Sequence, residues 1–517
     1  MKNIYIKIII GLLFLPLSIW AQTTTENYIK TTTYKVETAT PISNPTASQA
    51  VVQINYFDGL GRPKQQIALK QSGNGKDIIT HLEYDALGRQ TKEYLPYTDG
   101  TTSLDYRTNA LTDLLSFYLS EDPTVTGNPY FETTTNPYAE TFFEPSPLNR
   151  TRKTAAPGDI WKGNETNNND KSIKFDYTTN TNNVKRFTVT TDLNSNGIFY
   201  PTLHLDNGNY QPNQLYVTIT KDENWIAGTT FNTTHEFKDK LGRVVLKRTF
   251  GESNTRETAP DLVHDTYYVY DEYNNLTFVL PPLVNTNLPI TNDVLNGLCY
   301  QYKYDHRNRL VEKKLPGKQW EYIVYDQLDR PVATGPANSP FVNLTNPGWI
   351  ITKYDALNRP IITGFMIENN PFTSTVRKNL QVIYNNQTTH SETKIHTSSN
   401  TTINNVSFRY TSTSYPTDGY HVLTVNYFDD YNFPNAPTIP SEVEGQPVYY
   451  NNTLKPKGLP TANWVRVVSS SLITTQYELT YFLYDKYANP IKTYTSNHIT
   501  GFTETDSKFD FSGKVLY

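Results

Sequence analysis

The sequence predicts an all-β protein built from repeated β-hairpins, with an irregular insertion in its N-terminal half. Three observations carry this prediction: an aromatic-Asp type of turn that recurs ten times, a period-two alternation of side chains ahead of it, and a composition with 39 Tyr and 23 Phe among 517 residues. Aromatic side chains favour strands, and they bury large areas while Tyr hydroxyls find hydrogen-bond partners. A turn that recurs along a chain indicates a repeated supersecondary unit, which decides the architecture.

The recurring turn is defined by an Asp and by the residue three positions after it. Its clearest copies read YDALGR from Tyr84, YDHRNR from Tyr304, YDQLDR from Tyr325 and YDALNR from Tyr354. The Asp carboxylate can accept a hydrogen bond from the backbone N–H two residues on, which predicts a structural role for it. The ten Asp residues are Asp58, Asp85, Asp239, Asp271, Asp305, Asp326, Asp355, Asp429, Asp485 and Asp510.

The residue at Asp+3 must supply the positive φ that closes such a turn. Nine of the ten are Gly, Asn or Asp, the residues that enter the left-handed region most easily. The tenth is Ala488, and because Asn489 follows it, we expect that turn to be shifted by one residue. The Asp+3 residues are Gly61, Gly88, Gly242, Asn274, Asn308, Asp329, Asn358, Asn432, Ala488 and Gly513.

Strands are predicted on both sides of the turn. Tyr300, Tyr302 and Tyr304 alternate with Gln301 and Lys303, which is the signature of a strand with two different faces. A second apolar stretch follows each turn, as in RVVLKRTF over 243–250. Spacings between successive Asp residues run from 21 (305 to 326) to 34 (271 to 305), which fits two strands with their turns.

With these residues in view, the chain resembles the bacterial RHS/YD-repeat proteins, whose repeats combine a Tyr-Asp pair, a Gly-Arg turn and an apolar strand. The segment 221–250 carries this resemblance closely, and NYFDGLGRPKQQ over 55–66 is similar to the start of an uncharacterised domain that precedes the repeats in some of them. The resemblance covers residues 50–97 and 230–517. It implies hairpins that spiral into a large curved or hollow β-shell around an enclosed cargo.

The N-terminus predicts export. Lys2 and Lys7 precede an apolar run over 8–20, and Ala21 offers a small residue at a cleavage point, as in a secretory signal peptide. The run is too short to span a bilayer, and nothing after it supplies a transmembrane segment. Together with the resemblance, this predicts a protein secreted from a Gram-negative bacterium or held at its surface in association with the outer membrane. A retained membrane anchor is the alternative.

Cysteine and charge exclude two further classes. Cys299 is the only cysteine, so an exported chain of this kind has no disulfide framework and depends on burial and β-hydrogen bonding. The net charge is −4 and no long basic block occurs, which argues against nucleic acid as a partner.

The predicted organisation has four parts. Residues 1–21 are the signal peptide, and residues 22–160 form an N-terminal RHS-associated domain with the first two repeat units. Residues 161–235 are an irregular β-rich segment without a clean repeat. Residues 236–517 hold the remaining repeats, interrupted by inserts near 365–420 and 433–475 and truncated at the C-terminus. The one predicted helix covers Leu111 to Leu119.

The sequence predicts no catalytic residue and no cofactor. HEFKD at His235 begins like a zinc motif, but Asp239 stands where the second His belongs. DLNSNG, with Asp192, Asn194 and Asn196, matches the first half of a calcium loop, although Leu203 occupies the closing position and only Asp206 is near enough to contribute. The alternative is an Asx-rich hairpin turn that ends in Asn-Gly.

Three functional hypotheses follow. The first is a non-catalytic scaffold, the N-terminal part of a shell that encloses and delivers a C-terminal effector or toxin in interbacterial competition. Its implied partners are a missing core and effector domain of the same polypeptide. The second is a surface adhesin or carbohydrate-binding repeat protein, with a surface glycan as partner, although Trp161, Trp225, Trp320 and Trp464 are scattered along the chain. The third, a hydrolase, would need two carboxylates facing each other in a cleft.

Overall fold

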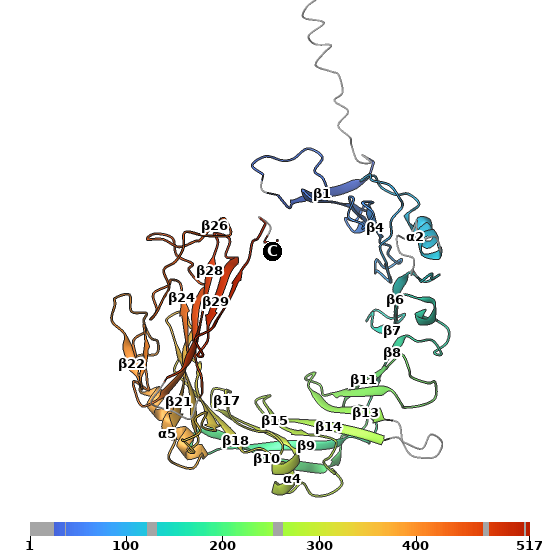
Figure 1. The fold of residues 1–517 in the computed structure, drawn as a ribbon. Coiled ribbons are helices and arrows are strands. Elements are labelled where there is room, and N and C mark those ends of the chain that lie inside the picture. The colour runs from blue at the N-terminus through green and yellow to red at the C-terminus, as the bar shows by residue number, and fades with distance from the viewer. Residues whose placement is uncertain are drawn as a thin grey trace, which may run out of the picture. The chain divides into compact units, whose positions relative to one another are not determined.

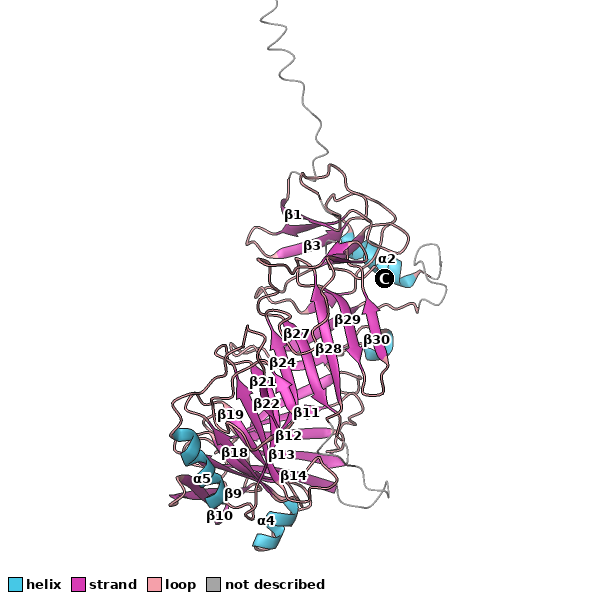
Figure 2. Cartoon of the chain, turned by 60° about the vertical axis from the view of Figure 1, so that its left-hand side comes forward, coloured by secondary structure: helices cyan, strands magenta, loops and turns pink. Residues whose placement is uncertain are grey.

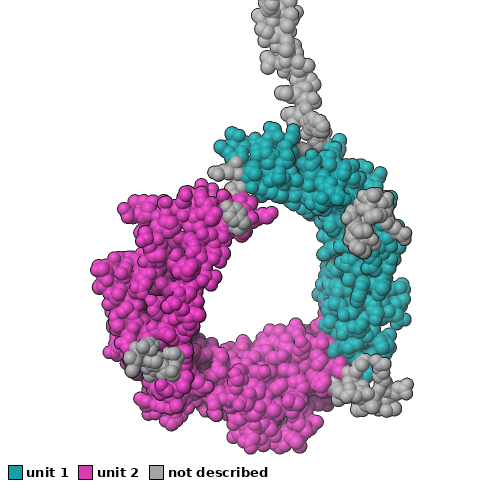
Figure 3. Space-filling view, viewed as in Figure 1, with its two compact units in different colours: residues 1–176, 219–233 teal, residues 177–218, 234–517 magenta. Residues whose placement is uncertain are grey.

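The computed structural model describes residues 25–36, 38–120, 132–251, 262–468, 475–510 and 513–516. The predicted signal peptide and its cleavage point at Ala21 lie outside these ranges. The described chain is nearly all β, as predicted, and its strands run antiparallel to their neighbours along the sequence (Figure 1). It forms two compact units, Met1–Asp176 with Ile219–Thr233, and Tyr177–Thr218 with Thr234–Tyr517 (Figure 3).

Unit 1 begins with a four-stranded sheet and continues with short hairpins. Strand β2 alternates buried and half-buried residues along its length, so that Val52, Ile54 and Tyr56 face one core. Helix α2 (Ala110–Leu119) packs on that core through Leu114 and Phe117, which agrees with the predicted helix. The strands are β1 (Asn27–Tyr34), β2 (Ala50–Phe57), β3 (Pro63–Ala68), β4 (Ile78–His81), β5 (Lys92–Tyr94), β6 (Tyr138–Phe143) and β7 (Thr151–Ala155), and a short 3-10 helix, η1, covers Asp159–Trp161.

Residues 161–235 are more regular than the sequence predicted. Strands β8 (Ile173–Thr179), β9 (Lys185–Leu193), β10 (Ile198–Asn209) and β11 (Tyr216–Lys221) occupy nearly half of this segment. Strands β9 and β10 form a long hairpin in which Phe199 pairs with Leu193 and Leu205 pairs with Phe187. The sequence predicted a β-rich segment here but did not locate the individual strands, because Thr is a good strand former that carries no apolar signal.

Unit 2 is dominated by one antiparallel meander, whose later strands lie side by side in Figure 2. Each strand pairs with the next along the chain, except where the two long inserts separate β21 from β24 and β24 from β27. The strands are β12 (Thr233–Lys238), β13 (Val244–Gly251), β14 (Leu262–Tyr270), β15 (Leu276–Leu280), β16 (Tyr300–Asp305), β17 (Leu310–Lys314), β18 (Trp320–Tyr325), β19 (Pro331–Ala337), β20 (Gly348–Tyr354), β21 (Pro360–Ile367), β24 (His421–Phe428), β27 (Pro460–Arg466), β28 (Tyr477–Tyr484), β29 (Pro490–Ser496) and β30 (Phe502–Asp506).

The inserts carry secondary structure that the sequence did not reveal. Helix α5 (Ser374–Asn385) and the hairpin of β22 (Thr401–Ile403) and β23 (Val406–Phe408) lie in the first insert, and β25 (Glu442–Val443) pairs with β26 (Gln446–Pro447) in the second. Helix α4 (Asn292–Leu298) lies between β15 and β16. The prediction of a single helix is therefore wrong. Thr291 and Thr373 cap α4 and α5 by accepting a hydrogen bond from Val294 N and Val376 N, a cap signal that the surrounding Asn and Thr residues obscured.

The first insert packs against the sheet of unit 2. Phe408 and Tyr420 from the insert are fully buried together with Trp349 of β20 and Val422 of β24. A buried ion pair adds to this packing: Lys353 Nζ of β20 lies 2.8 Å from Glu392 Oε1 of the insert, and their side chains are 1% and 0% exposed. The apolar core and this ion pair together hold the insert in place.

In the part of the chain that the structure describes, no helix combines the length and the apolar character needed to cross a bilayer.

Candidate functional site

The recurring turn is closed by one Asp side chain, as Asp305 shows. Its backbone N–H donates to Arg309 O at 3.0 Å, and Asn308 N donates back to Asp305 O at 2.9 Å. Asp305 Oδ1 accepts hydrogen bonds from Arg307 N and Arg309 N, and Oδ2 accepts one from Arg309 Nε at 2.8 Å. A carboxylate is the side chain for this place, because it has the lone pairs to accept all three hydrogen bonds at once.

Most of the predicted turns share this geometry. In Asp58, Asp85, Asp239, Asp326 and Asp355 the same Oδ1 and Oδ2 contacts recur with an Arg at Asp+4. In Asp271 and Asp485 an Asn at Asp+4 replaces the Arg, and its side-chain amide donates to Oδ2. The backbone hydrogen bonds from Arg62 and Arg89 hold the pKa of Asp58 and of Asp85 below the usual range.

Nine of the ten Asp+3 residues have positive φ, between 57° and 82°. Ala488 is one of them, with φ 67°, and Tyr487 N and Asn489 N both donate to Asp485 Oδ1. The expected shift of this turn toward Asn489 is therefore wrong. The four contacts of the Asp side chain and backbone fix the register, so the Ala adopts a conformation that its Cβ disfavours.

We expect Ala488→Gly to stabilise unit 2 by about 1 kcal/mol, because Gly has no Cβ and so removes the strain at positive φ. This net gain already includes the opposing effect of Gly, which raises the conformational entropy of the unfolded chain. The urea midpoint of unfolding followed by near-UV circular dichroism checks this. Ala356→Gly is the matched control, since Ala356 is also an exposed turn residue but follows Asp355 directly and lacks positive φ. We expect Ala356→Gly to lower the stability of unit 2. If both variants raised it, the gain at position 488 could not be attributed to relief of backbone strain.

The turn at Asp429 departs from the pattern. Here Asp429 itself has positive φ, 73°, and Asn432 does not, which corrects the prediction for Asn432. Asn432 N donates instead to Asp430 Oδ1, and Asp429 N pairs with Leu459 O at the far end of the second insert. The sequence FDDYN fits the repeat turn, but the strand that pairs with β24 does not follow directly after it. That strand, β27, begins only at Pro460, after the second insert.

A second layer of contacts links each turn to the next. The Arg of one turn donates to the side-chain oxygen at Asp+3 of the following turn, as from Arg309 to Asp329 and from Arg330 to Asn358, each at 2.8 Å. The same contact joins Arg243 to Asn274, and Asn275 makes it to Asn308 in place of Arg. An Asn or Asp at Asp+3 therefore has two roles: its backbone adopts the positive φ of the turn, and its side-chain oxygen accepts a hydrogen bond from the preceding turn.

The aromatic residue before the Asp completes this linkage. The Arg of the preceding turn stacks on its ring at 4.3 to 5.0 Å from the centroid, as Arg330 does on Tyr354 and Arg359 on Phe428. Where the ring is Tyr and an Arg stacks on it, the Tyr hydroxyl donates to the carbonyl of the residue after that Arg, as from Tyr354 to Pro331 O at 2.8 Å. We call this chain of contacts between successive turns the turn ladder.

Three further turns use the same backbone pattern without an Asp. Ser72, Asn194 and Asn497 each pair their N–H with the carbonyl four residues on, and each accepts a hydrogen bond from the backbone N–H at that position. A related but wider turn lies at Glu144–Arg150, where Glu144 N pairs with Arg150 O six residues on. Asn149 has positive φ there and accepts a hydrogen bond from Arg89, which stacks on Phe143. The stretch 98–235 therefore contains repeat turns that the Asp-based pattern missed.

The candidate calcium loop is one of these turns. Asn194 Oδ1 accepts hydrogen bonds from Asn196 N at 2.9 Å and Ile198 N at 3.1 Å, and Gly197 has φ 71°. This is the geometry of the Asx-rich hairpin turn. Its two hydrogen bonds engage Asn194 Oδ1, an oxygen that a calcium ion in this loop would need. Asp192 lies within β9, and the side chain of Asp206 lies outside the described set. Among the described residues no group of three His, Cys, Asp or Glu side chains is placed to hold a metal ion.

The candidate residues for other chemistry are separated or buried. Trp225 donates to Thr229 O, Trp320 lies against Lys303, and Trp464 is 8% exposed, so these rings have structural contacts. Trp161 is 42% exposed in η1. Burial raises the pKa of the Cys299 thiol to about 11, so this cysteine is not a reactive thiolate.

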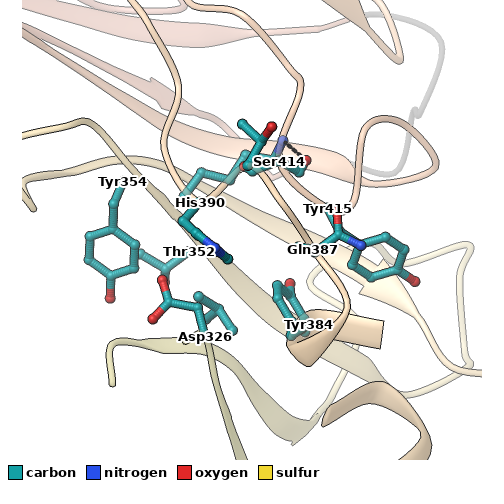
Figure 4. Close-up of a pocket in the computed structure, with 11 residues that line it drawn as sticks. Asp326, Thr352, Tyr354, Tyr384, Gln387, His390, Ser414 and Tyr415 are labelled. Carbon is teal, nitrogen blue, oxygen red and sulfur yellow. Dashed lines mark hydrogen bonds between the residues drawn. The ribbon is translucent and has the colours of Figure 1, made fainter. Parts of the chain in front are cut away.

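One pocket lies between the turn of Asp326 and the first insert (Figure 4). Asp326, Tyr354, Tyr384 and Tyr415 surround a cavity of about 10 Å³, which is room for a single water molecule. Asp326 is 2% exposed, and its carboxylate is already bound to Arg330. This pocket is a packing defect rather than a site for a substrate.

A larger groove opens where the turn ladder departs from its pattern. Its volume is about 820 Å³, and it lies between Asp429 and Asp430 on one side and Tyr450 and Lys455 on the other. A smaller space of about 180 Å³ lies beside it along Asp355, Arg359 and Lys394. Asp429 and Asp430 are two carboxylates in a groove, but Arg359 donates to both oxygens of Asp429, and Lys394 lies 2.6 Å from Asp430 Oδ1.

Comparison with known proteins places a domain in unit 1. Residues 30–179 match a family described as a domain of unknown function, DUF6443. No curated protein matches this chain.

Among solved structures, the chain is similar to the crystal structure of TcdB2-TccC3, at 13% identity over 90% of this chain and 20% of that one, with a TM-score of 0.40. It is similar to TcdB2-TccC3 without its hypervariable C-terminal region, at 12% identity over 90% and 19%, with a TM-score of 0.39. It is also similar to a Tc holotoxin pore of Photorhabdus luminescens, at 13% identity over 90% and 19%, with a TM-score of 0.36. The chain thus spans about a fifth of the length of the structures that it matches.

Proposed function

We propose that this chain is a non-catalytic RHS/YD-repeat scaffold. It is exported, and it forms the N-terminal part of a shell wall that encloses a C-terminal effector of the same polypeptide for delivery in interbacterial competition. The observation that carries the proposal is the turn ladder. Successive hairpins are held in register by an Arg, an aromatic ring and an Asp+3 acceptor, as from Arg309 to Asp329 and from Arg330 to Asn358, so the wall grows by repetition.

The chemistry of the described side chains supports a scaffold over an enzyme. The repeated Asp carboxylates, which are the most numerous candidates for acid or base catalysis, are bound within their own turns. Asp429, in the groove of about 820 Å³, is held ionised: burial alone would raise its pKa, but the hydrogen bonds from Arg359 and Gly458 lower the pKa further than burial raises it. A carboxylate held ionised in this way is a poor general acid.

The length and protease resistance of the native polypeptide test this proposal. Intact mass of the protein from its own cells, followed by limited proteolysis, should show a chain that continues past Tyr517 and a C-terminal domain cleaved only after the wall is unfolded in urea. A native product that ends at Tyr517 with nothing protected would overturn the proposal.

A carbohydrate-binding adhesin is the second candidate, and one observation favours it. The rings of Tyr481, Tyr494 and Phe502 stack across β28, β29 and β30 with centroids 5.1 and 5.4 Å apart, and Phe502 is 63% exposed. Such a ring can stack on the apolar face of a sugar. Glycan binding that is lost in Phe502→Ala, together with a native chain ending at Tyr517, would favour this candidate over the scaffold.

A further inference from the structure

The groove at Asp429 lies at the one predicted turn whose conformation departs from the repeat. Both long inserts contribute to it: the first supplies His396, and the second supplies Tyr450, Lys455 and Lys457. Its volume of about 820 Å³ lies within the range of ligand sites in proteins. Positions where a repeat breaks its own local rule are where a function has been added to a fold.

Both carboxylates on the acidic side of the groove are already paired with cations. Arg359 Nη1 and Nη2 donate to Asp429 Oδ1 and Oδ2 at 3.1 and 2.6 Å, and Gly458 N donates to Oδ1 at 2.7 Å. Asp430 Oδ1 lies 2.6 Å from Lys394 Nζ. These contacts fix the groove wall and offset part of its negative charge, because Arg359 also pairs with Asp355.

The basic side of the groove is not neutralised. Among the described residues neither Lys455 nor Lys457 has a carboxylate within ion-pair distance, and Lys455 lies over the ring of Tyr450 at 4.2 Å. His396, whose side chain is 71% exposed, lies 3.5 Å from Asp430, and an imidazole adds no negative charge to the groove. The lining therefore presents two uncompensated ammonium groups within one groove.

An apolar residue completes the arrangement. Leu357, in the turn after β20, lines the same groove and is 69% exposed, although its N–H is fixed to Asp355 Oδ1 at 2.9 Å. A rigid backbone that holds an exposed Leu beside two ammonium groups suits a ligand that combines carboxylates with an apolar side chain.

We propose that this groove binds an acidic peptide segment, with carboxylates at Lys455 and Lys457 and an apolar side chain at Leu357. Nucleic acid suits the groove less well. Lys455 lies over one face of the Tyr450 ring at 4.2 Å and Tyr431 is buried, so these two rings offer a base little surface to stack on. The proposal does not depend on the scaffold function, since it concerns only this groove.

The test is a fluorescence-anisotropy titration of the purified protein with a labelled peptide, Gly-Ser-Glu-Leu-Glu-Glu-Ser-Gly. We expect saturable binding that weakens as salt is added. Lys455→Gln with Lys457→Gln should weaken it about tenfold, which is the size of two exposed charge pairs. Lys240→Gln with Lys318→Gln removes the same charge from exposed turns of unit 2 and should leave the affinity unchanged.

Two further measurements separate this ligand from others. The peptide with Ser in place of Leu should bind several-fold more weakly, and so should the original peptide to Leu357→Ser. An unchanged affinity in the Lys455 and Lys457 variant, with its melting temperature also unchanged, would overturn the proposal. So would an oligonucleotide of equal charge that binds more tightly than the peptide, because it would identify the groove as a general polyanion surface.

Discussion

Asp326→Ala should lower the local stability of the β18–β19 hairpin by about 3–5 kcal/mol, which is the cost of removing one partner from a buried ion pair. The Asp326 and Arg330 side chains are 2% and 9% exposed, and the variant leaves the Arg330 guanidinium without its carboxylate. It also leaves the N–H groups of Leu328 and Arg330 without their acceptor. Native-state hydrogen exchange of the amides in β18 and β19 measures the change in opening free energy.

Two variants separate the charge from the turn geometry. Asp326→Asn keeps an oxygen for the two N–H groups, as Asn194 does in its own turn, and should lose about half as much stability as Asp326→Ala. Asp85→Ala makes the same deletion in a turn where the Asp and Arg side chains are 21% and 25% exposed, and its effect should be smaller. Equal losses at Asp326 and Asp85 would show that burial of the ion pair is not what makes the turn at Asp326 stable.

Lys353→Met should have an effect of similar size, about 3–5 kcal/mol, on the packing of the first insert. Glu392 is fully buried, and besides Lys353 it accepts hydrogen bonds from Thr411, Thr413 and Ser414. Without the ammonium group, these donors alone must hold a buried carboxylate. Hydrogen exchange of β22, β23 and α5 measures the loss, and thermal unfolding reports whether the sheet itself survives.

A surface pair provides the control. Lys313 and Glu321 lie 2.9 Å apart with side chains 35% and 36% exposed, so Lys313→Met should cost less than about 1 kcal/mol. If the two Lys→Met variants lose equal stability, the insert is held by its apolar core alone.

The pH dependence gives a second readout. Burial by itself would raise the pKa of Glu392, but Lys353 and the hydrogen-bond donors lower it below the usual range. A carboxyl with a lowered folded pKa contributes stability above its unfolded pKa, and this contribution is lost as the pH falls through the folded pKa. In Lys353→Met the buried carboxyl takes up a proton at a higher pH than in the parent. The difference between parent and variant should therefore narrow as the pH falls from 7 toward about 4.

The sequence predicted the hairpins because both of their signals are local. Alternation over Tyr300 to Tyr304 and the positive φ required at Asn308 act within six residues, and both are found in the structure. The links between turns could not be predicted from composition or spacing. The acceptor for Arg330 is Asn358, 28 residues away, and nothing in either turn alone indicates that contact.

The missed turns have a simpler cause. The Asp-based pattern does not include Ser72 or Asn194, although a hydroxyl or amide oxygen accepts the same backbone hydrogen bond. A search for Ser, Asn or Asp followed three residues later by Gly or Asn would have found them. The different conformation at Asp429 could not be predicted, because its local sequence fits the repeat turn. The long insert before Pro460 separates the two strands that such a turn would otherwise join.

The turn ladder also bears on how such a chain can change over evolutionary time. Where the pattern is complete, a hairpin presents a ring to the hairpin before it and an Arg to the hairpin after it, so such a copy carries both halves of the same joint. When a whole hairpin is duplicated or deleted, the two neighbours that meet afterwards still match. Recombination between copies would therefore lengthen or shorten the protein without new compensating substitutions, whereas a break inside a hairpin would leave two unmatched ends.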